Sequence, residues 1–342
     1  MLIGQITRLI RIRQQTAKTP VATASILYRD LSPAAVDYDW SLSSSIERRS
    51  FIVTQHTDST PNNDWIITIT CDDQPGLVHA ITGGIVDAHG NIEESQQFHS
   101  TDTGRFFMRL RISTPASEHQ LRAALTPVVE QYHLDLTLRE SDRPTKTLVL
   151  VSKAAHCLQD LLFRQNSGQA NIEIPRVFGN HPDLADLAGF YGVPFTSLPI
   201  KSAEDKHAFE QRIMKYVEEN DIELVVLARY MQILSPELCD FLSGRAINIH
   251  HSFLPGFKGA NPYLQAHQRG VKLIGATAHF VTADLDEGPI IEQNVVRVDH
   301  SKSPAQLRAI GQDVESRTLR QAVTWFAERR ILRDGQRTII FQ

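Results

Sequence analysis

The segment ELVVLA, residues 223–228, is the most apolar strand candidate in the chain and decides its fold class. A second run of the same kind is TLVLV, at residues 147–151. Continuous apolar runs of this length are typical of strands that lie inside a parallel sheet and are covered by helices on both faces. Strand and helix patterns alternate along the rest of the C-terminal part. They predict a doubly wound, Rossmann-like α/β domain over residues 144–342.

The remaining elements of this domain can be placed by the signals at their ends. Ser303, followed at once by Pro304 and with Gln306 at the third helical position, predicts the capped start of a helix. The pair Asp334-Gly335 predicts the turn of a terminal hairpin. Strands are expected at residues 172–179, 246–250, 276–281 and 290–298, and helices at residues 181–192 and 262–269.

A smaller unit is expected before this domain, over residues 64–143. WIITIT, at residues 65–70, is strand-like and is followed by a break, CDDQPG, and then by apolar residues at helical spacing. Further strand, helix and turn patterns continue the order βαββαβ, which is that of a ferredoxin-like sandwich. The fold class expected for the whole chain is therefore α/β, with a ferredoxin-like domain ahead of the Rossmann-like domain.

The turn at residues 73–76 of the smaller unit is a candidate binding site. Pro75 and Gly76 fix a tight entry into the following helix, which leaves backbone N–H groups free to hold a carboxylate. The stretch DDQPGLVHAITGGIVDAHGNI resembles the start of an ACT domain, a module that senses amino acids. The resemblance implies an amino-acid effector near Asp73, Pro75 and Gly76, and a protein that assembles with copies of itself. A turn that only connects strand to helix explains these residues equally well.

The first 63 residues have the composition of a leader and a linker. Residues 1–29 carry several basic residues and no acid, which fits an organellar presequence, a disordered leader or a start codon assigned too early. Residues 30–63, rich in Ser, Asp, Thr and Asn, fit a linker. We expect a cytoplasmic protein, and the basic leader leaves a mitochondrial location as the alternative.

The composition limits the class of partner. The net charge is -4 and the charges are interspersed, so the basic surface of a nucleic-acid-binding protein is not expected. The 3 cysteines lie far apart without CxxC spacing, which argues against a disulfide framework and a zinc site and fits a reducing compartment. No apolar run approaches the roughly 18 residues that a membrane-spanning helix needs. We therefore expect a small-molecule substrate, no metal, no nucleic acid and no membrane partner.

Asn248 and His250 end the strand candidate AINIH and are the first candidate active-site residues. Because they are two residues apart on a strand, they point to the same side, at the edge where open parallel sheets bind ligands. A carboxamide beside an imidazole is suited to polarise a carbonyl oxygen and to stabilise the oxyanion that forms when the carbonyl is attacked. The loop after a later strand offers Asp284, Asp286 and Glu287 as groups that accept a proton or position a water molecule.

The segments INIHHSFLP, GATAHFV and LDEGPI occur in this order and resemble the folate-dependent formyltransferase superfamily. The resemblance runs from about Lys146 to the C-terminus. It implies that Asn248, His250 and Asp286 are the catalytic residues. His279 matches a further histidine of the superfamily, and we expect it to orient a neighbouring group rather than to transfer a proton.

The substrate wall is expected in LARYMQILSPEL, residues 227–238. This stretch resembles the pterin-binding segment of the superfamily, in which main-chain groups pair with the edge of the pteridine ring. An apolar slot with accessible backbone polar groups suits a flat heterocycle. Ser235 ahead of Pro236 can cap a helix at the same place, and the two interpretations are compatible. The expected substrate contacts are Met231, Gln232, Ile233, Leu234, His279, Thr282 and Asp284, although Asp284 and Glu287, taken alone, fit solvated charges.

The choice between hydrolysis and formyl transfer depends on a place for a phosphate. A transferase that acts on a ribonucleotide needs a backbone cradle for phosphate, but VSKAAHCLQDLL, residues 151–162, contains no glycine. Water is then the natural nucleophile. HHSFLP, and an ACT-like domain ahead of the formyl-handling domain, resemble the 10-formyltetrahydrofolate deformylases. This resemblance implies hydrolysis of 10-formyltetrahydrofolate to formate and tetrahydrofolate without a cofactor, which supplies formate toward purine synthesis.

Two other functions stay open from the sequence alone. A phosphoribosylglycinamide formyltransferase, or another folate-dependent formyltransferase, would pass the formyl group to an amine. A binding protein that senses amino acids would carry the same α/β domain without catalysis.

Two details of the candidate site are also expected. A buried Asp286 carboxylate with a raised pKa would suit proton transfer beside an imidazole. His251 faces away from His250 and supports the site by holding the loop or the attacking water.

Overall fold

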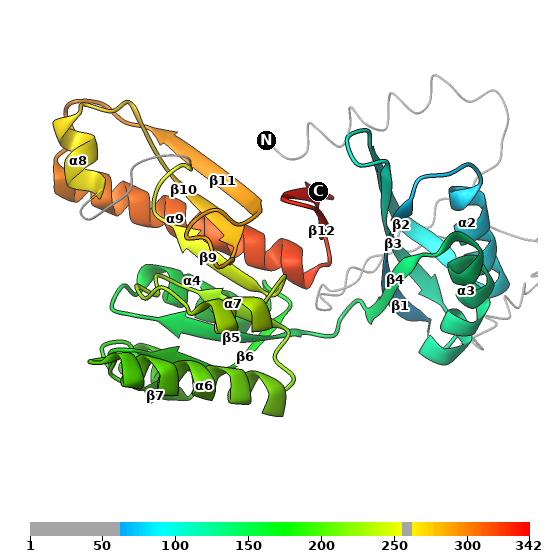
Figure 1. Cartoon of the computed structure of the whole chain (residues 1–342), viewed down its shortest axis with the longest axis horizontal. Coiled ribbons are helices and arrows are strands. Elements are labelled where there is room, and N and C mark those ends of the chain that lie inside the picture. The colour runs from blue at the N-terminus through cyan, green and yellow to red at the C-terminus, as the bar shows by residue number, and fades with distance from the viewer. Residues whose placement is uncertain (1–61, 255–261) are drawn as a thin grey trace, which may run out of the picture. The chain divides into compact units, whose positions relative to one another are not determined.

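The computed structural model describes residues 62–254 and 262–342. The expected leader and linker, residues 1–63, therefore lie almost entirely outside the described residues. Figure 1 shows a smaller unit, which spans residues 63–140, and a larger unit, which begins with the strand at residue 145.

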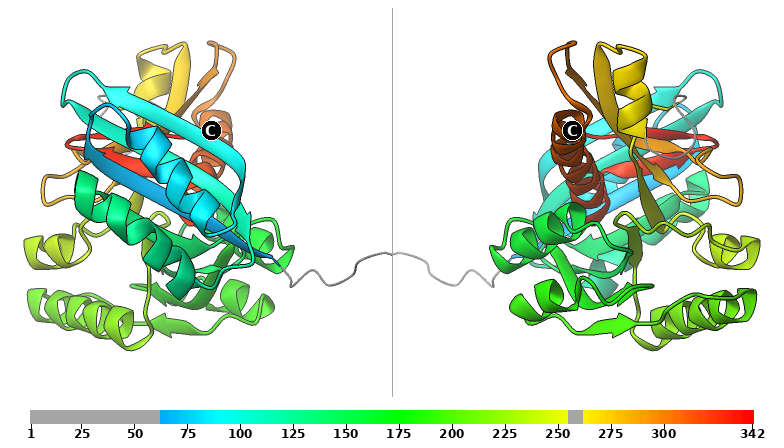
Figure 2. Two further views of the ribbon diagram at one scale, coloured as in Figure 1. Left: turned by 90° about the vertical axis from the view of Figure 1, so that its right-hand side faces the viewer. Right: turned by 90° about the vertical axis from the view of Figure 1, so that its left-hand side faces the viewer.

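The smaller unit is an antiparallel sheet covered by two helices on one face. Its elements are β1 (Asn63–Asp72), α2 (Leu77–Asp87), β2 (Asn91–Ser100), β3 (Arg105–Thr114), α3 (Glu118–Tyr132) and β4 (Asp135–Glu140), and its strand order is β2-β3-β1-β4. Ile67 and Leu110 of the sheet share a core with Ile81 and Leu121 of the helices, and all of them are fully buried. Both helices lie on the same face in Figure 2. The predicted ferredoxin-like order βαββαβ is confirmed.

The larger unit is a mixed sheet with helices on both faces. Its strands follow the order β11-β10-β9-β8-β5-β6-β7; β5 to β9 are parallel, and β10 and β11 are antiparallel to their neighbours. The expected doubly wound α/β fold is confirmed. The strands are β5 (Thr145–Val151), β6 (Ile172–Gly179), β7 (Phe195–Ser197), β8 (Leu224–Leu227), β9 (Ala246–His250), β10 (Leu273–Phe280) and β11 (Ile290–Arg297). The helices are α4 (His156–Asn166), α5 (Ala185–Phe190), α6 (Ala203–Glu219), α7 (Pro236–Phe241), α8 (Pro262–Gln268) and α9 (Pro304–Ala327).

The apolar runs that predicted this sheet are continuous because the central strands face helices on both sides. Val149 of β5 lies in one core with Leu161 of α4, whereas the preceding residue, Leu148, lies in a separate core with Phe209 of α6. All four side chains are almost completely buried. Burial of each such side chain contributes about 1.5–3 kcal/mol. The two cores fix the sheet as a rigid support for the loops at its edge.

The strand order creates a switch point in the middle of the sheet. From β5 the chain passes to β6 and β7 on one side, and later returns to β8 and β9 on the other. The connections that leave β5 and β8 therefore diverge, and open α/β sheets bind ligands at such a point, beyond the carboxyl ends of the strands. Asn248 and His250 lie at the carboxyl end of β9, the next strand along.

Several element boundaries differ from the sequence prediction. The helix expected at residues 181–192 is only α5, because a turn closed by the hydrogen bond from Ala185 N–H to the Pro182 carbonyl precedes it. The short strand β7 was not predicted, since three half-buried residues show no apolar period. The cap at Ser303 is confirmed, and its Oγ accepts from Gln306 N–H. The predicted hairpin is β12 (Ile331–Asp334) with β13 (Arg337–Ile340).

Among the residues that the structure describes, no helix is both long enough and apolar enough to cross a membrane. The longest of the described helices, α9, has its buried residues interrupted by charged and polar ones, as a core helix of a globular domain does.

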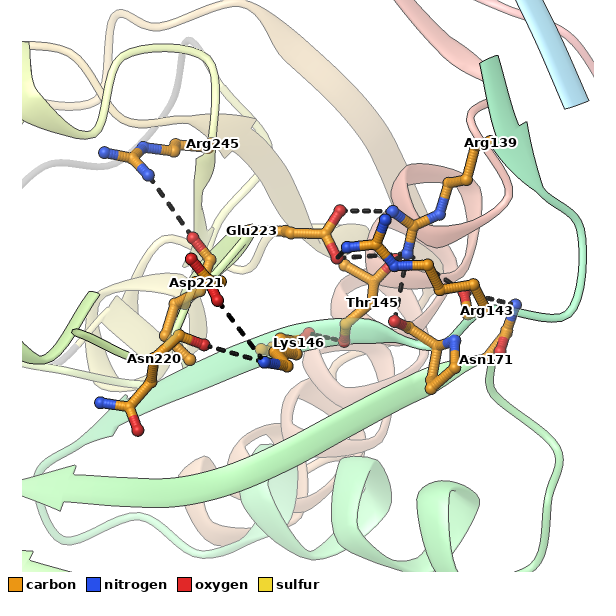
Figure 3. A network of polar contacts seen from close by, with 12 residues as sticks. Arg139, Arg143, Thr145, Lys146, Asn171, Asn220, Asp221, Glu223 and Arg245 are labelled. Atoms are coloured by element: carbon orange, nitrogen blue, oxygen red, sulfur yellow. Dashed lines mark hydrogen bonds and ion pairs between the residues drawn. The ribbon is translucent and has the colours of Figure 1, made fainter. Parts of the chain in front are cut away.

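A buried arginine connects the end of β4 with the larger sheet (Figure 3). Arg139, 7% exposed, forms an ion pair with Glu223 ahead of β8 and donates to the Arg143 carbonyl and to Thr145 Oγ1. Arg329 donates to the same carboxylate at 2.7 Å. Burial raises the pKa of Glu223, but the hydrogen bond and charge of Arg139 and the charges of Arg329 and Arg143 outweigh it and leave the pKa below its ordinary value. The carboxylate therefore stays ionised between the arginines.

Replacing Glu223 with Gln should destabilise the fold, because Arg139 then stays buried without a counter-charge. Breaking a buried pair costs about 3–5 kcal/mol, and the partial exposure of Glu223 favours the lower end, about 3 kcal/mol. Urea denaturation at pH 7 measures the change in unfolding free energy. The control Glu219→Gln, which removes an exposed pair with Lys215, should cost less than about 0.5 kcal/mol. Equal effects of the two substitutions would contradict the role of the buried pair.

Candidate active site

A cavity of about 330 Å³ lies at the carboxyl ends of β8 and β9. Asn248 and His250 of β9 line it, together with His279 of β10, the antiparallel partner of β9. The loop between β10 and β11 brings Asp286 to the same cavity. Side chains that are distant in the sequence therefore meet at the edge of the sheet where a ligand was expected.

Asp286 connects two histidines of this cavity. His250 Nδ1 lies 3.2 Å from Asp286 Oδ2, and His279 Nε2 lies 3.6 Å from Oδ1 of the same carboxylate. His279 Nδ1–H donates to the Phe280 carbonyl at 2.8 Å, so its Nε2 accepts the 3.2 Å hydrogen bond from Asn248 Nδ2. The structure thus brings together Asn248, His250 and Asp286, and His279 holds the amide of Asn248.

A second contact fixes the ring of His250. Its Nε2 and the hydroxyl of Ser252 are 2.8 Å apart, and the carbonyl of Ser252 accepts from Thr277 Oγ1 on β10 at 3.0 Å. Both ring nitrogens of His250 are therefore engaged in a buried environment. The sequence analysis gave Ser252 no role, and its position two residues after the candidate imidazole was the signal that could have identified it.

The carboxylate of Asp286 is held in its charged form. The hydrogen bond from His250, and then the contact with His279, lower its pKa well below the ordinary value, against the opposing effect of burial. The expectation of a raised pKa is therefore wrong. The sequence indicated burial, whereas the position of the two imidazoles decides the direction of the shift. Asp286 also has φ 59°, a backbone conformation that is uncommon outside glycine.

The expected substrate wall lines the cavity. Met231, Gln232, Ile233 and Leu234 all contribute to it. The side chains of Met231 and Ile233 are 58% and 60% exposed, whereas Leu234 belongs to the buried core. Met231 N–H donates to Ser152 Oγ at 2.9 Å, which fixes the start of the segment. Large apolar side chains exposed side by side with a polar cluster are typical of a binding surface.

The loop residues Thr282 and Asp284 are placed differently from one another. Thr282 lines the cavity, and its hydroxyl donates to the Asp284 carbonyl at 3.0 Å. Asp284 is exposed and does not belong to the cavity lining, and the neighbouring Leu285, which is 56% exposed, takes part in it instead. The exposed carboxylate of Asp284 has the surroundings of a solvated charge.

His251 lies against His250 and does not face away from it, which corrects the prediction. The two rings are stacked with centroids 5.1 Å apart and planes at 18°. The prediction extended strand alternation beyond β9, which ends at His250. His251 Nδ1 contacts Arg229 Nη1 at 2.6 Å, and Arg229 Nε lies 3.2 Å from Glu315 Oε2. The sequence analysis missed Arg229 and Glu315, although an acid on the apolar face of α9 was a usable signal.

Comparisons with known proteins agree with the fold and the site described above. Residues 145–323 match the Formyl transferase family. The formyltetrahydrofolate deformylase of Corynebacterium sp. (strain P-1) is 46% identical to this chain over 280 residues, which cover 81% of this chain and 98% of that protein. The chain belongs to the formyltetrahydrofolate deformylase family.

Solved structures extend the likeness to the deformylase family across both units. The crystal structure of formyltetrahydrofolate deformylase from Burkholderia mallei has a TM-score of 0.79 at 48% identity, and the match covers 82% of this chain and 100% of that chain. The structure of glycinamide ribonucleotide transformylase 1 from Symbiobacterium toebii has a TM-score of 0.54 at 30% identity and covers 58% of this chain and 95% of that chain. The transformylase is therefore similar to a smaller part of the chain.

Among the described residues of this deformylase-family chain, one cluster has the side chains that a metal ion could use. It consists of His156 and Cys157 at the start of α4 and Glu315 of α9. Glu315 is 1% exposed and already engaged by His156 Nε2 at 2.8 Å, by the Tyr263 hydroxyl at 2.5 Å and by Arg229. Burial raises the pKa of the Cys157 thiol. With these contacts, the cluster is suited to hold Arg229 in place. That the reaction uses no metal stays a prediction.

The turn expected to bind an effector has the tight geometry that its residues predict. Gly76 precedes α2 with φ 93°, and a Cβ there would lie 3.0 Å from the Tyr132 hydroxyl. Asp73 Oδ2 contacts His99 Nδ1 at 2.9 Å, and Pro75 is exposed. These contacts are those of a tight connection between β1 and α2. An effector at this turn stays a prediction.

Replacing Gly288 with Ala should disturb the loop that carries Asp286. A Cβ at Gly288 would lie 1.8 Å from the Phe280 carbonyl oxygen, and Phe280 N–H is itself bound to the Pro289 carbonyl. We expect a loss of about 1–3 kcal/mol in unfolding free energy, measured by urea denaturation, and a displaced Asp286 in a crystal structure. Gly189→Ala on α5 meets no atom within 4 Å and should leave stability unchanged or raise it by up to about 1 kcal/mol. A Gly288→Ala variant with an unchanged unfolding free energy and an unmoved Asp286 would contradict the tight fit.

Proposed function

We propose that this protein hydrolyses 10-formyltetrahydrofolate to formate and tetrahydrofolate. The observation that carries the proposal is the meeting of Asn248, His250 and Asp286 in a cavity beside the exposed side chains of Met231 and Ile233. Groups that can act on a carbonyl thus border an apolar surface that suits a flat ring. Membership of the deformylase family, over most of the chain, supports the same reaction. The reaction releases formate for purine synthesis and returns free tetrahydrofolate to the one-carbon pool.

The amide of Asn248 is suited to stabilise the charge that develops on the formyl oxygen. One N–H of its Nδ2 is bound to His279 Nε2, which fixes the plane of the amide and leaves the second N–H for the substrate. A donor that is already in place does not have to reorganise when the oxyanion forms. Such a donor contributes roughly a factor of 10²–10³ to the rate.

His250 carries the proton in this reaction, and Asp286 stabilises its protonated ring. Water attacks the formyl carbon and gives up a proton, and the bond from this carbon to N10 of the folate breaks as N10 takes up a proton. Asp286, with its lowered pKa, is a weak base near neutral pH. Its negative charge, 3.2 Å from His250 Nδ1, instead stabilises the imidazolium that forms when His250 receives the proton from water. His250 then passes that proton to N10.

The segment after β5 favours hydrolysis over transfer to a ribonucleotide. Its hydroxyl group, on Ser152, accepts the N–H of Met231 at 2.9 Å. Ala155, which precedes α4, offers no side-chain cap, and residues 151–162 contain no glycine. A nest of backbone N–H groups for a phosphate normally needs such glycines. A folate-dependent formyltransferase with an amine acceptor is therefore the weaker alternative.

The smaller unit fits a regulatory role, because a ferredoxin-like sandwich with a tight turn before its first helix is the architecture that the ACT resemblance implies. An amino-acid effector and a homo-oligomer are the partners that this role would involve, and both stay predictions. The cytoplasmic location and the absence of a cofactor also stay predictions.

Asp286→Asn should lower the rate of formate release by roughly 10²–10⁴ while folate binding is kept, because the variant removes the charge that stabilises protonated His250. Formate is measured with purified protein, 10-formyltetrahydrofolate and no amine acceptor, and binding is measured by fluorescence titration. The neighbouring Glu287→Gln, an exposed carboxylate in the same loop, is the control and should keep the wild-type rate. Near-normal turnover of Asp286→Asn would contradict its role. Formyl transfer that requires an added amine would contradict hydrolysis.

A further inference from the structure

The two adjacent histidines of the cavity face opposite charges. His250 Nδ1 lies 3.2 Å from the Asp286 carboxylate, and His251 Nδ1 lies 2.6 Å from a guanidinium nitrogen of Arg229. The rings are stacked with centroids 5.1 Å apart. Two imidazoles at this separation repel each other when both are protonated. The pair therefore accommodates one proton much more easily than two.

Arg229 determines the tautomer of His251. A guanidinium carries donors and no acceptor, so the Nδ1 atom that it contacts must accept, and the proton of the neutral ring lies on Nε2. Burial, followed by the charges of Arg229 and His250, lowers the pKa of His251 to about 4. Glu315 and Asp286, the acids that face this ring, act in the opposite direction and are outweighed. His251 is therefore neutral at neutral pH.

The position of Arg229 is itself fixed by a buried acid. Glu315 of α9 is 1% exposed, pairs with Arg229 Nε at 3.2 Å, and is also bound by His156 and the Tyr263 hydroxyl. Hydrogen bonds from His156 and Tyr263 and the charge of Arg229 keep the pKa of Glu315 below its ordinary value, although burial, the largest single effect, opposes them. Arg229 has φ 62°, in the left-handed region that residues other than glycine rarely adopt. A strained arginine anchored on a buried carboxylate points to a function beyond packing.

We propose that Arg229, anchored by Glu315, is a positioning residue that keeps His251 neutral and so directs the proton of the reaction onto His250. The inference rests on the proposed hydrolysis, in which His250 carries that proton. The oxygen of water bonds to the formyl carbon while His250 takes its proton, and the carbon–N10 bond then breaks while His250 returns the proton to N10. His251 neither gains nor loses a proton in this sequence. A cationic His251 would repel the proton on His250 and slow the first step, in which His250 takes up the proton of water.

Arg229→Met tests the proposal through His251 itself. ¹⁵N NMR of the histidine rings should show wild-type His251 neutral at pH 6 with its proton on Nε2. In Arg229→Met its titration midpoint should rise by at least about one pH unit. The acid limb of the kcat–pH profile should move to higher pH by a similar amount. Arg229→Lys, which keeps the positive charge, should bring both the His251 midpoint and the kcat–pH profile most of the way back to their wild-type values.

Additional variants separate this role from a structural one. Arg229→Met leaves Glu315 buried without its cation, so the double variant R229M/E315Q, which removes both charges, is used if the single variant folds poorly. Its shifts should have the same direction but be smaller, because the charge of Glu315 raises the pKa of His251. In a His251→Asn background, Arg229→Met should no longer move the kcat–pH profile. Arg320→Met, which removes an ion pair between α9 and Asp160 of α4, should leave the His251 titration and the profile unchanged.

The outcomes that overturn the proposal are distinct from those that overturn hydrolysis. A wild-type His251 that titrates near the ordinary value of about 6.5, or that carries its proton on Nδ1, contradicts it. It is also contradicted by a profile shift that persists in the His251→Asn background, or by a His251 titration that shifts without any change in the profile. If the wild-type protein releases no formate, hydrolysis fails and the proton-directing role fails with it, even where NMR shows His251 neutral.

Discussion

The antiparallel register between β9 and β10 places Asn248 opposite His279, and the rest of the site is built on this pairing. Along β9, Asn248 and His250 alternate with Ile247 and Ile249, which lie in the large core. A slip of one residue would turn both isoleucines toward the cavity and the polar pair into the core. Burial of apolar area therefore decides on which face Asn248 lies, and the chemistry of the cavity depends on hydrophobic packing behind it.

The site also holds several charged groups in little space. Asp286 faces the imidazole of His250, and the guanidinium of Arg229 faces the carboxylate of Glu315. A catalytic site needs neighbouring titratable groups whose environments push their pKa values apart. Here the Asp286 carboxylate lies beside His250, and the Arg229 guanidinium lies beside His251, whose ring is stacked on that of His250. The electrostatic difference between the rings is therefore a property of the loops around β8 and β10, since the rings are chemically identical.

How far the sequence could predict this arrangement depends on whether a feature is local. Strand β9, the cap at Ser303 and the terminal hairpin are set by neighbouring residues, and their predictions are confirmed. The direction of the Asp286 pKa shift depends on its distances in space to His250 and His279, which the sequence does not contain, and the prediction was wrong. The orientation of His251 failed for a related reason, because alternation holds only inside a strand and His251 is the first residue after one. The partnership of Arg229 with Glu315 joins residues 86 positions apart, and no local pattern contains that distance.

The role of α9 shows why a core helix can carry functional information. Its apolar stripe packs on the sheet, but Gly311 and Glu315, one turn apart, lie on the same face of the helix and are both buried. A Cβ at Gly311 would lie 2.0 Å from the Tyr263 hydroxyl, so only glycine leaves room for that hydroxyl to reach Glu315. Tyr263 then satisfies an acid that would otherwise be costly to bury, and the acid in turn holds Arg229. Glycine at position 311 therefore bears on the charge state of His251 in the cavity, because Tyr263, Glu315 and Arg229 connect the two residues through successive contacts.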